Sequence, residues 1–117
     1  MIFIHGFLGH AFEFKPYLEY FENKVRWISI SILGLEKKFP KPKDLNEITP
    51  KMFIDLIVDF VTRILKFKRI ILVGHSFGAI LGQAFVYHHP DLIAGVNFNW
   101  NSNIPVHLGF LAYTNSR

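Results

Sequence analysis

Residues 70–78 read IILVGHSFG, and this stretch decides the fold. Its apolar first half predicts a buried strand, and the residues that follow Ser76 predict a helix. A chain that turns from a strand into a helix within one residue strains the backbone of that residue and points its side chain out above the sheet edge. Gly74 and Gly78 leave room for the strand and the helix to cross closely. We therefore expect Ser76 to present an exposed hydroxyl.

Strand and helix patterns alternate along the rest of the chain. Continuous apolar runs are typical of strands buried in a parallel sheet, and they predict four strands: Ile2–Ile4, Val25–Ile32, Ile70–Val73 and Leu92–Phe98. Helical spacing and N-terminal signals predict three helices: Pro16–Phe21, a helix from Thr49-Pro50 through Leu65, and one from Ser76 that ends before Pro90. The alternation predicts an α/β fold, a mostly parallel sheet with helices on both faces. Residues 33–50 are rich in lysine and proline, and we expect a solvated loop there.

A second motif, His5-Gly6-Phe7-Leu8-Gly9, directly follows the first predicted strand. A strand followed by H-G-x-x-G, with a strand followed by G-x-S-x-G about seventy residues later, resembles the α/β-hydrolase family. The resemblance runs from residue 1 to about residue 100 and implies a three-layer αβα fold. It also implies that residues 5–9 form an oxyanion loop.

The resemblance assigns roles to single residues. Ser76 would be the nucleophile, and the backbone N–H groups of Phe7 and Phe77 would form the oxyanion hole. Phe7, Phe12 and Phe77 are candidates to line an apolar acyl pocket, and Phe7 and Phe77 are the stronger ones because they flank the site. From its position, His5 is expected to hydrogen-bond backbone and hold the loop rather than act as a base, and His75 to point away from Ser76. The remaining motif residues would support this arrangement: Gly6, Gly74 and Gly78.

A serine nucleophile needs a base within hydrogen-bond reach and an acid that orients the base. In the family these follow the nucleophile, first Asp or Glu and then His. After Ser76 the only carboxylate side chain is Asp91, which is expected at the opposite edge of the sheet. The His88-His89 pair falls at the far end of the helix, and only His107 could fold back. We therefore expect residues 1–117 to be a single, incomplete α/β-hydrolase domain that resembles the N-terminal portion of the family.

Composition narrows the classes of partner and cofactor. The net charge of +4 is modest and basic residues are not interleaved with aromatic ones, so we do not expect nucleic acid binding. The absence of cysteine excludes disulfides and fits a reducing, cytoplasmic location. The six histidines form no metal-binding pattern, and no cofactor is expected. No apolar run is long enough to span a membrane, and no signal peptide is visible.

Functions of two classes remain open. The first is a serine hydrolase, similar to an esterase or thioesterase, that acts on a small-molecule acyl substrate; a Ser-dependent lyase of the same fold also fits. Serine at this position argues against epoxide or haloalkane opening, for which related members use a carboxylate. The second class is a catalytically inactive protein of the same fold that binds an apolar ligand or a partner. In either class an open apolar sheet edge would favour self-association.

Overall fold

Four parallel strands form one sheet in the computed structural model, which describes residues 1–6, 9–32 and 49–99. Their order across the sheet is β2-β1-β3-β4, and their bounds are β1 Ile2–Ile4, β2 Ile28–Ile30, β3 Ile70–His75 and β4 Ile93–Asn99. Ile4 of β1 pairs with Gly74 of β3, so the carboxyl ends of the two central strands lie level. The two motifs that follow these strands are therefore brought to the same edge of the sheet.

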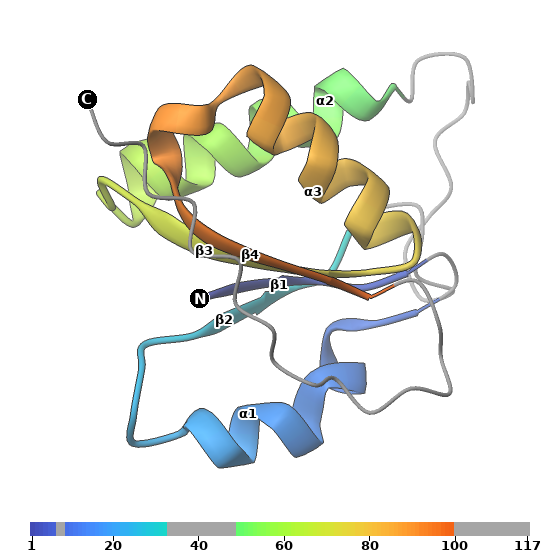
Figure 1. The fold of residues 1–117 in the computed structure, drawn as a ribbon, viewed down its shortest axis with the longest axis vertical. Coiled ribbons are helices and arrows are strands. Elements are labelled where there is room, and N and C mark those ends of the chain that lie inside the picture. Colours follow the sequence, from blue (N-terminus) through green and yellow to red (C-terminus); the bar gives the residue numbers. More distant parts are fainter. Residues whose placement is uncertain (7–8, 33–48, 100–117) are drawn as a thin grey trace.

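Helices cover both faces of this sheet. Two lie on one face, α2 (Pro50–Asp59) and α3 (Phe77–His88), while α1 (Lys15–Phe21) lies on the other (Figure 1). Shorter turns extend them: η1 (Ala11–Phe14) leads into α1, the π-helical turn η3 (Phe60–Ile64) continues α2, and η4 (Pro90–Leu92) precedes β4. The three-layer α/β architecture expected from the sequence is confirmed.

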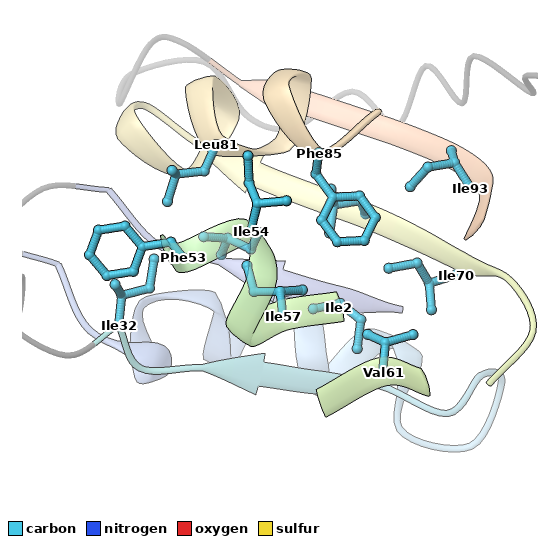
Figure 2. Close-up of a cluster of buried hydrophobic side chains, with 12 residues drawn as sticks. Ile2, Ile32, Phe53, Ile54, Ile57, Val61, Ile70, Leu81, Phe85 and Ile93 are labelled. Carbon is cyan, nitrogen blue, oxygen red and sulfur yellow. The ribbon is translucent and has the colours of Figure 1, made fainter. Parts of the chain in front are cut away.

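The core is divided by the sheet into two clusters of buried side chains. The alternation of β1 explains the division, because Ile2 and Ile4 face α2 and α3 whereas Phe3 faces α1. Figure 2 shows side chains from α2, α3 and the strands meeting in the larger cluster. Its buried members are Ile2, Ile4, Ile32, Phe53, Ile54, Ile57, Val61, Ile70, Leu72, Leu81, Phe85 and Ile93. The smaller cluster contains Phe3, Phe14, Leu18, Phe21 and Val73.

Several predicted boundaries differ from the structure, and two of the differences have a local cause. β2 ends at Ile30 instead of Ile32, β3 continues to His75, and β4 is displaced to Ile93–Asn99. The second strand was expected from Val25 but begins at Ile28. The reason is that the N–H of Val25 donates to the Phe21 carbonyl, which ties this residue to the end of α1 instead of the sheet. The third helix was expected to begin at Ser76 but begins at Phe77, because Ser76 has non-helical backbone angles. Of the expected loop 33–50, residues 33–48 lie outside the described residues, and Thr49 and Pro50 start α2.

Candidate active site

Ser76 connects β3 to α3 in a conformation that few residues adopt. Its backbone angles are φ 53° and ψ −116°, and its side chain is exposed. The N–H of Ser76 donates to the Asn99 carbonyl at 2.8 Å, so β4 holds the turn on one side. The Ser76 carbonyl accepts from the N–H groups of Ala79 and Ile80, which starts α3. The turn therefore fixes the serine hydroxyl above the carboxyl end of the sheet.

The glycines on either side of Ser76 permit close backbone contacts. A Cβ atom added at Gly74 would lie 2.5 Å from the Gly78 carbonyl oxygen. One added at Gly78 would overlap with the carbonyl oxygen of Ile4 in β1. Real Cβ atoms do not approach backbone this closely, so only glycine allows α3 to cross β1 and β3 at this separation.

The loop after β1 lies directly against this turn. A Cβ atom added at Gly6 would be 3.1 Å from the Cβ of Ser76 and 3.3 Å from the His75 carbonyl oxygen. The N–H of Gly9 donates to the Gly6 carbonyl at 3.0 Å. The structure thus brings together the two motifs that were predicted to share the site. Phe7, predicted as one oxyanion donor, lies outside the described residues.

His5 is buried and has both ring nitrogens in hydrogen bonds with backbone. Its Nε2 accepts from the N–H of Ile32 at 3.0 Å, which leaves the proton on Nδ1. Nδ1–H then donates to the Gly6 carbonyl at 2.7 Å. His5 therefore joins the loop after β1 to the end of β2, as predicted from its position, and has no free nitrogen for a substrate proton.

Phe77 is the second predicted oxyanion donor, and it lies at the first position of α3. The first N–H groups of a helix have no intrahelical acceptor, and the helix dipole adds partial positive charge at this end. An anion formed beside the Ser76 hydroxyl would meet these groups. The geometry is suited to stabilising negative charge on an oxygen atom.

Sequence reasoning missed Glu13, which the fold places at this site. Its Oε1 lies 3.2 Å from Nδ1 of His75 and 3.4 Å from the backbone nitrogen of Gly6. His75 accordingly points toward the β1 loop and η1. No motif spacing links residues 62 positions apart, so only the packing of η1 beside β1 could have identified the pair.

Within the described residues no triad acid and base are assigned to Ser76, because the adjacent His75 directs Nδ1 to Glu13. Asp91 is exposed in η4, before β4, and thus at the opposite edge of the parallel sheet. His88 ends α3, about 18 Å from Ser76 at the rise of an α-helix. His107, the remaining candidate base, lies outside the described residues.

Three further kinds of feature bear on function within residues 1–6, 9–32 and 49–99: a metal site, a membrane-spanning helix and a cleft. This part of the chain has no group of three or more side chains that could hold a metal ion. It also has no helix with the length and hydropathy needed to cross a membrane. A cleft of about 400 Å³ lies beside α1, away from Ser76, and is lined by Ala11, Phe12, Lys15, Leu18, Glu19, Glu22, Trp27 and Ser29.

Several known proteins are similar in sequence to this chain. Epoxide hydrolase 3 of Xenopus tropicalis is 27% identical over 93 residues, which are 80% of this chain and 25% of the relative. "Probable lysophospholipase BODYGUARD 1" of Arabidopsis thaliana is 32% identical over 98 residues, 80% of this chain and 20% of the relative. The chain therefore spans a quarter or less of the length of these relatives.

Among solved structures, a mutant epoxide hydrolase from Bacillus megaterium superposes with a TM-score of 0.73. It is 24% identical, and the match covers 84% of this chain and 34% of that protein. At this identity the superposition establishes the fold alone. The sequence model of the alpha/beta hydrolase family, in contrast, matches residues 1–113, nearly the whole chain. The chain therefore belongs to the alpha/beta hydrolase family.

Proposed function

We propose that this chain supplies the nucleophile and part of the oxyanion hole of a serine hydrolase that acts on an ester or thioester. One observation carries the proposal: Ser76 has a positive φ, an exposed hydroxyl and a position against the Gly6 backbone at the N-terminus of α3. Backbone strain of this kind costs about 1–3 kcal/mol and is concentrated at functional sites.

In the proposed reaction Oγ of Ser76 forms a bond to the acyl carbon, and the carbonyl electron pair moves to the oxygen. The N–H of Phe77 stabilises that oxyanion, and the sequence motif predicts Phe7 as the second donor. A base takes the serine proton. The oxyanion then re-forms the carbonyl, the bond from the acyl carbon to the leaving group breaks, and the base returns the proton to that group. Water then hydrolyses the acyl-serine. The described residues do not supply this base. The hydrolase activity is therefore proposed for the whole protein.

The nucleophile separates ester cleavage from epoxide opening. A carboxylate that opens an epoxide forms an ester, which water can cleave afterwards. A serine hydroxyl would form an alkyl ether, which water does not cleave under the same conditions. Ser76 therefore favours an acyl substrate, although some relatives are named epoxide hydrolases.

The test compares covalent labelling and turnover in the purified full-length protein. We expect a fluorophosphonate to label Ser76, identified by mass spectrometry, and Ser76→Ala to lower ester hydrolysis by about 10³-fold or more. Thr62→Ala removes a hydroxyl that donates to the Val58 carbonyl in the α2–η3 segment, and this control should retain both signals. Hydrolysis that persists in Ser76→Ala, or labelling confined to another residue, would refute the proposal.

A non-catalytic member of the family is the second candidate. It is favoured by the places of Asp91 and His88, which follow Ser76 in the sequence but lie before β4 and at the far end of α3. In that case the protein would unfold cooperatively, would bind an apolar ligand or a partner, and would give neither labelling nor turnover. The same labelling experiment therefore separates the two candidates.

A further inference from the structure

Glu13 joins the two motifs of the site through one carboxylate oxygen. Oε1 lies between two donors, the N–H of Gly6 at 3.4 Å and Nδ1 of His75 at 3.2 Å. The Glu13 and His75 side chains are only 27% and 28% exposed, so solvent screens this contact less than the exposed ion pairs elsewhere on the chain. A Cβ atom added at Gly9 would overlap with Oε2, which places the carboxylate against the loop backbone.

The backbone that carries Glu13 is itself anchored. Its N–H donates to the His10 carbonyl at 3.1 Å within η1. The next residue, Phe14, is buried, and its ring packs on that of Phe3 in β1 with centroids 5.1 Å apart. The carbonyl of Ala11 accepts from the Ser29 hydroxyl at 2.7 Å. The carboxylate is therefore delivered from a segment fixed to both β1 and β2.

Gly6 is restrained on its two polar groups by different partners. Its carbonyl accepts from His5 and from the N–H of Gly9, and neither bond reaches the turn at Ser76. Its N–H faces Glu13, which also contacts His75, the residue before Ser76. Within the described residues, the Glu13 carboxylate is thus the side chain that ties the loop after β1 to the turn after β3.

We propose that Glu13 is a positioning residue that, as an acceptor for Gly6 N–H and His75 Nδ1–H, holds the Gly6 backbone against Ser76. The effect on the reaction rests on the proposed function: a displaced loop would impair stabilisation of the transition state more than binding of the substrate. Loss of the carboxylate should therefore lower kcat and leave KM within about twofold. Displacements of about 1 Å at such sites cost on the order of 10²-fold in rate, so we expect a loss of about 10- to 100-fold.

The kinetic test uses three variants of the full-length protein. Glu13→Ala removes the acceptor and should lower kcat, whereas Glu13→Gln keeps a carbonyl oxygen that accepts from both donors and should restore most of it. Glu22→Ala removes a carboxylate from the exposed end of α1 and is the control. An unchanged kcat in Glu13→Ala, or a Gln variant no better than the Ala variant, would overturn the role of Glu13 as acceptor.

A second measurement does not depend on turnover. Hydrogen exchange followed by NMR should show the Gly6 amide exchanging at least about tenfold faster in Glu13→Ala, while the amide of Phe85 in the core keeps its rate. The ring nitrogen signals of His75 should move in the same variant. Unchanged exchange at Gly6 would overturn the inference even in an active enzyme. If the wild-type protein lacks turnover but the Gly6 amide still exchanges faster in Glu13→Ala, the contact of Glu13 with Gly6 is supported. The proposed function is then refuted separately.

Discussion

Ser76 shows how a single residue can be held against its own conformational preference. A φ of 53° is disfavoured for a residue with a Cβ, and the cost is about 1–3 kcal/mol. The surroundings supply the compensation: the Asn99 carbonyl accepts its N–H, and the Ala79 and Ile80 amides donate to its carbonyl. Relaxing the turn would break these bonds, so the strain persists and the hydroxyl stays exposed.

The glycines around the turn permit a prediction at the same scale. Gly78→Ala places a methyl group on the Ile4 carbonyl, which belongs to the central strand and cannot move aside. We expect this variant to lower the free energy of unfolding by about 3 kcal/mol or more. Gly82→Ala is the matched control in the same helix, because its methyl group meets the ring of Phe98, a side chain that can rotate. In urea denaturation, Gly82→Ala should lose less than half as much free energy of unfolding as Gly78→Ala. Equal losses in the two variants would contradict the contact with Ile4.

The places of residues fixed by neighbours in sequence were predictable. The places of residues fixed by contacts distant in sequence were not. Ser76 and the glycines beside it follow from a strand and a helix adjacent in sequence. His5 followed from its place at the end of the first strand. Glu13 carried no signal, because its partner His75 is 62 positions away and the contact arises only when η1 packs beside β1.

At the scale of single elements, α2 begins with a signal that the sequence displays. Thr49 precedes Pro50, and its hydroxyl accepts from the N–H of Met52 at 3.2 Å. This side chain replaces an acceptor that the first turn of a helix lacks. The end of the same helical segment is less regular, because the Leu65 N–H donates to the Phe60 carbonyl five residues back. Periodicity predicted the span of this segment but not its π-helical end, where the wider turn leaves Ile64 70% exposed.

Removal of the Thr49 hydroxyl should therefore destabilise the protein. We expect Thr49→Ala to lower the free energy of unfolding by about 1 kcal/mol. Thr62→Ala is the control, because the Thr62 hydroxyl donates to the Val58 carbonyl within the same segment, a bond that adds little to helix stability. Thermal denaturation followed by circular dichroism compares the two. If both variants behave alike, the cap does not stabilise α2.

At the scale of the whole molecule, the sheet separates a large cluster from a small one. Twelve buried side chains lie between the sheet and α2 and α3, against five on the side of α1. Stability that comes from buried apolar area is therefore unequal between the two layers. Since η1 and Glu13 belong to the layer of α1, the contact of Glu13 with Gly6 depends on the layer that buries less apolar area.

This inequality predicts two levels of protection in native-state hydrogen exchange. The amides near the end of α1, such as Phe21, should exchange through openings of lower free energy than the amide of Phe85 in α3. Leu18→Ala should accelerate exchange in α1 and leave exchange at Phe85 unchanged at low denaturant. A single free energy of opening shared by both helices would show instead that the two layers unfold as one unit.

The order of elements, their alternation and the burial of the strands were predictable because each leaves a local pattern. Continuous apolar runs predicted all four strands, and the largest error in a strand boundary is at the start of β2, where Val25 bonds to the end of α1. Hydropathy does not record such a bond, which depends on how a helix terminates. The pairing of β1 with both β2 and β3 also leaves no local trace, and it was not predicted.

That central position of β1 has a consequence for synthesis. Its residues Ile2–Ile4 are almost completely buried, yet the neighbour β3 follows about 65 residues later. At a translation rate of roughly 5–20 residues per second, the nascent strand waits several seconds for that partner. During this interval an apolar segment with an unpaired edge stands beside the ribosome, where chaperones that recognise such segments can bind it. Since β2 can pair with β1 much earlier, the edge of β1 that meets β3 is the one that stays open longest during synthesis.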